Sequence, residues 1–233
     1  MNNYGRRSFV TIEPQQVQIG DILLPLSQKT WNMKGRHITI VILALVILDQ
    51  ILKIWVKTHM HLYESITIFD SWFQLKFVEN NGAAFGMQIL GQGTVDWGKL
   101  GLSLFRIVLV GVLIWYIFRL CKKKAPTGII IAFGMIIAGA IGNIIDSAFY
   151  GMIFSPSTSQ SIATFGGHYA PFMFGKVVDM FYFPLFKWAG HPGFLDFLFD
   201  YDGYFFGAIF NLADSYICIA IVYMILFQRK FFK

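Results

Sequence analysis

Residues 206–227 read FGAIFNLADSYICIAIVYMILF, a segment long and apolar enough to cross a lipid bilayer as a helix. Asp214 lies within it, and Asn211 lies three residues earlier. A charged side chain at the centre of a membrane helix costs about 2.5–3.5 kcal/mol on insertion scales, and more on others. An acid in such a segment therefore indicates a compensating partner or a chemical use.

The composition of the 233-residue chain is that of a membrane protein. Hydrophobic residues make up 56% of it and charged residues only 14%, whereas a soluble domain carries about 25% charged residues. The net charge of +6 does not indicate nucleic-acid binding, because the basic residues cluster just beyond apolar runs. The two cysteines, Cys121 and Cys218, form no CxxC or metal-binding pattern, so no disulfide framework is expected.

Four apolar windows predict four transmembrane helices, since a bilayer core of about 30 Å needs about 20 residues in a helix. The windows are residues 37–57, 100–119, 128–148 and 206–227. We therefore expect an all-α polytopic membrane protein with a single membrane domain at residues 33–233. Residues 1–32 are polar and carry no obvious motif, and we interpret them as a cytoplasmic N-terminal extension.

The distribution of positive charge predicts that both chain termini lie in the cytoplasm. Twelve basic residues fall on the side of the termini: Arg6, Arg7, Lys29, Lys34, Arg36, Arg119, Lys122, Lys123, Lys124, Arg229, Lys230 and Lys233. The other side has Lys57, Lys76, Lys99, Lys176 and Lys187, spread over two long loops. The first outer loop, 58–99, has the pattern of strands in a small sheet. The second, 149–205, is enlarged and rich in aromatic residues that favour the headgroup layer.

Strongly polar residues inside the predicted spans all fall toward the outer side. They are Asp49 and Lys53 in the first span, Arg106 in the second, Asn143 and Asp146 in the third, and Asn211 and Asp214 in the fourth. Asp49 and Lys53 are four residues apart and can pair on one helix face. Structural explanations exist for most of these residues: an ion pair, snorkelling of Arg106, interhelical hydrogen bonds of the asparagines, and solvation of Asp146. Their common depth instead indicates a site at the outer leaflet.

Paired carboxylates are the chemistry that these residues favour. The five histidines lie at or outside the span ends and form no HExxH pattern, which disfavours a zinc peptidase and a Ser–His pair. Two acids that share one water can divide the work, because one acts as the base while the other keeps its proton and polarises the scissile carbonyl. Asp49, Asp146 and Asp179 are the candidate partners of Asp214, and spacing alone does not choose between Asp146 and Asp179.

Five short motifs, in order along the chain, resemble those of a known family. They are DQILK (49–53), NNGAAF (80–85), GAIGNIID (139–146), VVDMF (177–181) and FNLAD (210–214). Together they resemble lipoprotein signal peptidase, the bacterial signal peptidase II. The resemblance implies an aspartyl endopeptidase of the bacterial cytoplasmic membrane that cuts diacylglyceryl-modified prolipoproteins before the lipidated cysteine. It implies no metal or organic cofactor.

The resemblance also implies roles for individual residues. It assigns the catalytic pair to Asp179 and Asp214, with water as the nucleophile. It assigns the shaping of the site and the binding of the lipidated peptide to Asp49, Lys53, Asn80, Gly82, Gly139, Gly142, Asn143, Asp146 and Asn211. The expected partners are prolipoprotein substrates and membrane lipid, with no nucleic acid, and the expected state is a monomer.

The chain departs from the family pattern at three places. Ser147 stands where the family usually has an arginine, and Arg106 and Lys176 are candidate replacements for that charge. Residues 155–174 and 182–205 lengthen the outer loop on either side of Asp179. Both additions are expected to lie beside the active site.

Two non-enzymatic functions are the alternatives. A transporter subunit with an ion or proton path would need polar residues at all depths, and the inner halves of the predicted spans have none. A lipid-binding or assembly factor would use the outer aromatic loops, and it would tolerate asparagine at positions 179 and 214.

Overall fold

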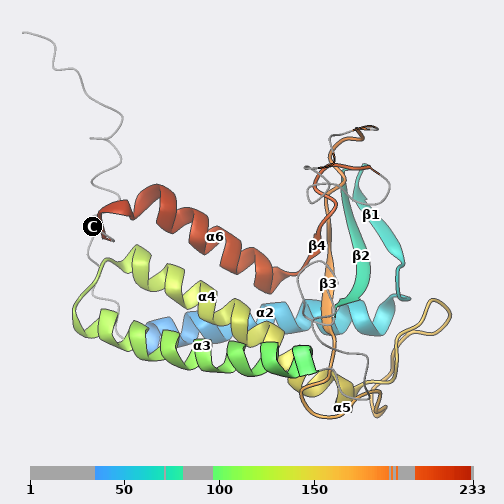
Figure 1. Ribbon diagram of the computed structural model, residues 1–233, viewed down its shortest axis with the longest axis horizontal. Coiled ribbons are helices and arrows are strands. Elements are labelled where there is room, and N and C mark those ends of the chain that lie inside the picture. Colours follow the sequence, from blue (N-terminus) through green and yellow to red (C-terminus); the bar gives the residue numbers. More distant parts are fainter. Residues whose placement is uncertain are drawn as a thin grey trace, which may run out of the picture.

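The computed structural model describes residues 35–70, 72–80, 97–188, 190, 193 and 203–231. Within this part of the chain, four main helices run side by side (Figure 1): α2 (Gly35–His59), α3 (Trp97–Lys122), α4 (Thr127–Ile145) and α6 (Leu212–Phe227). A π-helix, η2 (Asp146–Tyr150), and a helical turn, α5 (Gly151–Ile153), extend α4, and η4 (Arg229–Phe231) follows α6. Helix α4 contacts each of the other three helices. The predicted extension 1–32 lies outside the described residues.

Three helices of the described part are long and apolar enough to cross a membrane: Gly35–His59, Gly98–Lys122 and Thr127–Ile153. They correspond to the first three predicted spans. Large apolar side chains are exposed on them, such as Leu43 on α2 and Phe105 on α3. Lipid tails are the medium that favours such extensive apolar exposure. The chain is therefore a mostly helical membrane protein.

The fourth predicted span differs from the structure at its start. Helix α6 begins at Leu212 rather than at residue 206, and it is shorter than the other three helices. The residues before it form strand β4 (Ile209–Phe210), and Asn211 is the N-cap of the helix. The prediction that Asn211 lies inside the fourth helical span was therefore wrong, because Asn211 is the N-cap, which has an extended backbone and offers its side chain to the helix end.

A four-stranded antiparallel sheet stands across one end of the helices (Figure 1). Its strands, in spatial order, are β1 (Ser65–Phe69), β2 (Phe73–Asn80), β3 (Val177–Tyr182) and β4. The strands predicted between the first two spans are thus present. They are joined by β3 from the second outer loop and by β4 from the first residues of the fourth predicted span. Val178 and Met180 are fully buried in a core shared with α2, so strand alternation places Asp179 on the opposite face.

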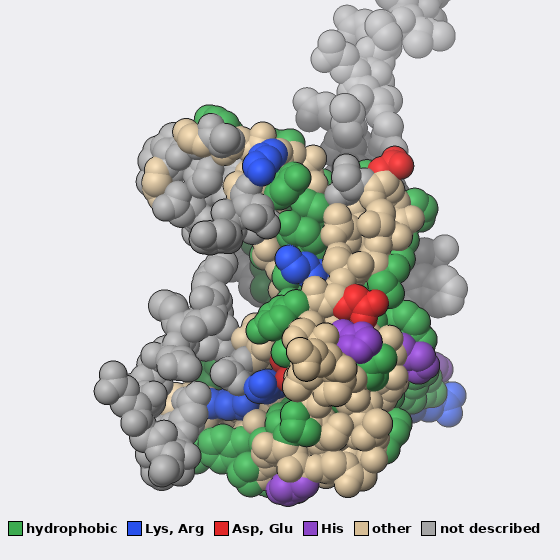
Figure 2. All heavy atoms as spheres, turned by 90° about the vertical axis from the view of Figure 1, so that its right-hand side faces the viewer, with side chains coloured by type: hydrophobic (Ala, Val, Ile, Leu, Met, Phe, Trp, Pro, Cys, Tyr) green, Lys and Arg blue, Asp and Glu red, His purple; other side chains and the backbone are tan. Residues whose placement is uncertain are grey.

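The end of the molecule that carries the sheet has a mixed surface. Basic, acidic and histidine side chains lie there among hydrophobic ones (Figure 2). Residues 155–174, which lengthen the outer loop, are anchored at this end by backbone hydrogen bonds. Leu62 N donates to Thr158 O at 3.0 Å, and Tyr169 N donates to Gly151 O at 2.8 Å. The added segment is therefore attached to the elements that surround the sheet.

Glycines let α4 and its neighbours approach closely at the sheet end. A methyl group at Gly139 would overlap the carbonyl oxygen of Ala213 in α6, and one at Gly142 would overlap the Asp49 carboxylate. The small residues therefore let α4 pack closely against α2 and α6. At Gly175 a methyl group would overlap the main-chain oxygen of Asp146, so this glycine lets the chain enter β3 directly beside η2.

Candidate active site

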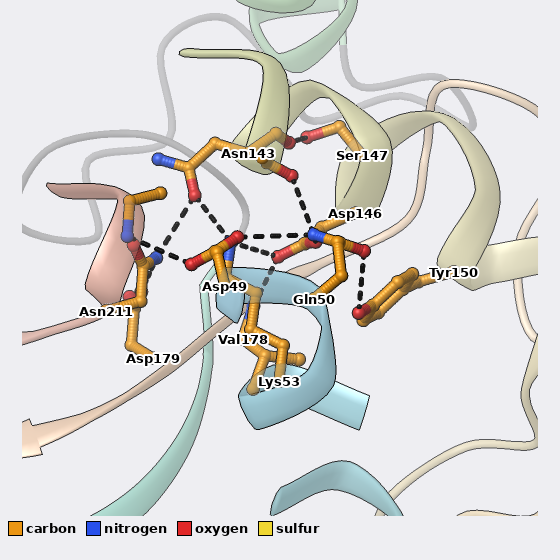
Figure 3. A network of polar contacts seen from close by, with 12 residues as sticks. Asp49, Gln50, Lys53, Asn143, Asp146, Ser147, Tyr150, Val178, Asp179 and Asn211 are labelled. Atoms are coloured by element: carbon orange, nitrogen blue, oxygen red, sulfur yellow. Dashed lines mark hydrogen bonds and ion pairs between the residues drawn. The ribbon is translucent and has the colours of Figure 1, made fainter. Parts of the chain in front are cut away.

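A buried lysine on α2 is the centre of a polar network at the sheet end of the helices (Figure 3). Lys53 Nζ lies 3.0 Å from Asp49 Oδ2 and 2.9 Å from Asp146 Oδ2, and all three side chains are fully buried. Lys53 Nζ also donates to Asn143 Oδ1 at 2.8 Å. The expected Asp49–Lys53 pair is confirmed, and the interpretation of Asp146 as a solvated acid is wrong. Buried charges persist when opposite charges and hydrogen bonds compensate them, as they do here.

Asp49 and Asp146 each fix the main chain of a further element. Asp49 Oδ1 accepts a hydrogen bond from Ala213 N at 2.9 Å. This N–H is one of those that the first turn of α6 leaves without an intrahelical partner, and an acid is favoured there by the helix dipole. Asp146 Oδ2 accepts from Val178 N at 3.2 Å in β3. Asp49 therefore holds the start of α6 against α2, and Asp146 holds the start of β3 against η2.

Asp179 is held by two amides. Its Oδ1 accepts from Asn211 Nδ2 at 2.7 Å, and its Oδ2 accepts from Asn80 Nδ2 at 3.2 Å. Burial, and next the charge of Asp214, raise the pKa of Asp179 to about 7, although the two amide hydrogen bonds act in the opposite direction. At neutral pH this carboxyl is therefore divided between its protonated and ionised forms.

Asp214 lies in the first turn of α6 and is tied to Asp179 through two asparagines. Asn143 Nδ2 donates to Asp214 Oδ1 at 2.8 Å, and Asn143 Oδ1 accepts from Asn211 Nδ2 at 3.1 Å. Asn211 in turn holds Asp179, and its Oδ1 caps the helix by accepting from Asp214 N at 2.9 Å. The two acids thus come from different elements, share one pair of amides and interact electrostatically.

The structure brings together the predicted site residues that it describes. One continuous set of hydrogen bonds and ion pairs joins Asp49, Lys53, Asn80, Asn143, Asp146, Asp179, Asn211 and Asp214. Gly139 and Gly142 border this set, because their missing side chains leave room for α6 and for Asp49. Gly82 lies outside the described residues.

Sequence reasoning missed Gln50 and Tyr150. Gln50 Nε2 donates to Asp146 Oδ1 at 3.0 Å and to Gly142 O at 3.2 Å, and Gln50 Oε1 accepts from Tyr150 OH at 3.1 Å. A polar glutamine inside a predicted span, next to Asp49, was the available signal. Tyr150 gave no signal, because tyrosine is common near membrane interfaces. These partners give Asp146 a structural role, which favours Asp179 as the partner of Asp214.

Two cations were candidates to replace the family's arginine at Ser147. Arg106, on α3, interacts electrostatically with both Asp179 and Asp214. Lys176 Nζ instead lies 3.3 Å from Glu79 Oε2. These interactions favour Arg106 rather than Lys176 as the cation that acts on the two acids.

Comparison with known proteins decides the family. The family model described as signal peptidase (SPase) II matches residues 41–230. The chain belongs to the signal peptidase II family. Signal peptidase II is an aspartic peptidase, so an acid pair is what its reaction requires.

This signal peptidase II has curated relatives along most of its length. It is 43% identical over 195 residues to lipoprotein signal peptidase of Porphyromonas gingivalis, covering 82% of each chain. It is 32% identical over 210 residues to that of Amoebophilus asiaticus, covering 88% of this chain and 80% of the relative. A bacterial membrane enzyme solved by the in meso method shares the fold with a TM-score of 0.54 at 21% identity, covering 84% of this chain and 89% of that one.

Proposed function

We propose that this signal peptidase II cleaves diacylglyceryl-modified prolipoproteins before the lipidated cysteine, using water activated between Asp179 and Asp214. One observation carries the proposal: two acids from separate elements are tied through Asn143 and Asn211 and interact with one another. The raised pKa of Asp179 lets one acid hold a proton while the other works as a base. Hydrolysis by an acid pair needs this division of roles.

In the proposed mechanism Asp179 begins with the proton and Asp214 acts as the base. Asp214 takes a proton from water as the water oxygen bonds to the scissile carbonyl carbon, and Asp179 gives its proton to the carbonyl oxygen. The C–N bond of the tetrahedral intermediate then breaks, the leaving nitrogen takes the proton from Asp214, and Asp179 recovers its own.

The arrangement of the helices supports a site at the outer leaflet of the cytoplasmic membrane. The C-terminus and the α3–α4 connection lie at the end opposite the sheet (Figure 1). Lys122, Lys123 and Lys124 cluster at that connection, and Arg36 lies in the first turn of α2. By the positive-inside rule this is the cytoplasmic end. Helix α6 is then the fourth span. Asp179 and Asp214 then lie near the membrane surface at the depth of the scissile bond, which the lipid anchor of the cysteine fixes there.

We interpret residues 33–233 as a single membrane peptidase domain that works as a monomer. The buried charged residues of the described helices, such as Asp49 and Lys53, gather toward the sheet end, where α2, α4 and α6 meet β3. A path for ions or protons would instead need polar groups through the full thickness of the bilayer. Membership of a peptidase family sets aside both non-enzymatic alternatives.

The proposal is tested by cleavage of a diacylglyceryl-modified prolipoprotein in detergent micelles. We expect release of the signal peptide at the same rate with and without EDTA, because two carboxylates and water supply the chemistry. A matched precursor without the diacylglyceryl group should react about 100-fold more slowly or worse, because remote binding energy positions the reacting bond. Failure to cleave several lipidated precursors, or full inhibition by EDTA, would refute the proposal.

The pH profile tests the role of Asp179 as the acid. Because this carboxyl must be protonated to act, kcat/KM should fall as the pH rises through about 7. Asn80 donates to Asp179 Oδ2 and so favours the ionised form. Asn80→Ala should therefore move the alkaline limb to higher pH, whereas Gln74→Ala on the same strand should leave it in place. A shift of the limb to lower pH in Asn80→Ala would contradict the assignment.

A further inference from the structure

A second buried ion cluster lies next to the site, where α2, β2 and residues 155–174 meet. Lys57 of α2 is fully buried, and the side chain of Glu79 in β2 is 3% exposed. The two form an ion pair, and Glu79 Oε1 also accepts from Ser157 Oγ at 2.8 Å. Lys57 Nζ donates to Ser157 Oγ at 3.0 Å. The buried hydroxyl of the added segment therefore contacts both members of the pair.

Other side chains at the same junction complete the cluster. Lys57 Nζ lies 5.4 Å from the ring centroid of Phe154 and 5.0 Å from that of Tyr169, distances at which a cation is attracted to an aromatic face. The hydroxyl of Tyr169 accepts from Lys176 N at 2.8 Å, directly before β3. Lys176 Nζ reaches back to Glu79 Oε2 at 3.3 Å. The added segment thus holds both β2 and the start of β3.

The cluster contacts these strands immediately beside Asp179. Glu79 precedes Asn80, which donates to Asp179 Oδ2. Glu79 also lies opposite Val178 in the β2–β3 ladder, and Val178 precedes Asp179. A displacement of Glu79 therefore moves Asn80, which donates to Asp179. It also moves β3, the strand that carries Asp179.

We propose that residues 155–174 position Asp179, with Ser157 and Tyr169 as positioning residues that act through Glu79 and the start of β3. The inference rests on the proposed catalytic role of Asp179. A buried ion pair contributes little net stability compared with apolar packing, so we expect this pair to act mainly on the position of Asp179. The rate is sensitive to that position, because a misplacement of about 1 Å costs about 100-fold in rate.

The test compares variants of one hydroxyl with the lipidated precursor as substrate. Ser157→Ala removes the contacts to Lys57 and Glu79, and we expect kcat to fall about tenfold with KM changed less than about twofold. Ser157→Thr keeps the hydroxyl and should restore most of the rate. Ser159→Ala, at an exposed position two residues away, is the matched control and should behave as wild type.

Tyr169→Phe tests the second contact, the hydrogen bond from Lys176 N to the Tyr169 hydroxyl. Tyr169→Phe keeps the ring beside Lys57 but removes the acceptor for Lys176 N, and it should also lower kcat with little change in KM. Thermal unfolding in detergent gives the fraction of folded enzyme for each variant. Normal kcat per folded molecule in both Ser157→Ala and Tyr169→Phe would overturn the positioning role alone. A wild-type enzyme that cleaves no lipidated precursor would overturn the proposed function and this inference with it.

Discussion

We expect Asp214→Asn to lower kcat at least about 1000-fold while the protein stays folded, and we expect the same of Asp179→Asn. Removal of a general acid or base typically lowers the rate about 100- to 10,000-fold. In the proposed mechanism both acids act in the same step, so the loss of either one also stops the work of the other. An asparagine at position 214 keeps an oxygen that can accept from Asn143, so the amide network need not collapse. What is lost is the ability to take a proton from water.

The double variant Asp179→Asn/Asp214→Asn tests whether the two acids act as one unit. Groups that act as a unit show strongly non-additive effects, so the double variant should be no slower than the slower single variant. Asp70→Asn is the matched control, because Asp70 is exposed in the β1–β2 turn and has a positive φ that asparagine tolerates. Cleavage within tenfold of wild type by either single variant, with equal thermal stability, would remove that residue from the catalytic pair.

The helices of this protein could be predicted because their signal is local. A run of about 20 apolar residues is sufficient to indicate a span, and the polar residues inside such runs already showed a common depth. The pairing of Asp49 with Lys53 was predictable for the same reason, since four residues in a helix bring two side chains to one face. The polar network is built largely from these locally recognisable residues.

The sheet and its contacts could not be predicted in the same way. Asp179 lies opposite Val78 in the β2–β3 ladder, a pairing between strands about 100 residues apart, and alternation within one strand does not identify its partner. Lys57 appeared in the sequence as one of several outer-loop lysines, yet it is fully buried against Glu79. Asn211 was placed within a helix because apolar residues precede it, but those residues extend the sheet.

The second large effect is expected at the centre of the network. Lys53→Met leaves two fully buried acids, Asp49 and Asp146, without the ammonium group that lies about 3 Å from each. Breaking a buried pair by removing one partner costs about 3–5 kcal/mol, because the remaining charge is uncompensated. Here both acids also hold main-chain groups of α6 and β3. We therefore expect a large fall in the temperature of unfolding in detergent micelles, together with loss of cleavage.

A compensating variant separates charge from packing in this result. Lys53→Met/Asp146→Asn leaves one uncompensated acid, Asp49, in place of two. The amide introduced at position 146 can still accept a hydrogen bond from Val178 N. Its unfolding temperature should lie above that of Lys53→Met and below that of wild type, whereas cleavage should stay low because Asn143 has lost its lysine donor. Lys123→Met, at an exposed lysine of the opposite end, is the control. If Lys53→Met unfolds at the same temperature as Lys123→Met, Lys53 does not hold the network together, and the acids must be stabilised by their hydrogen bonds alone.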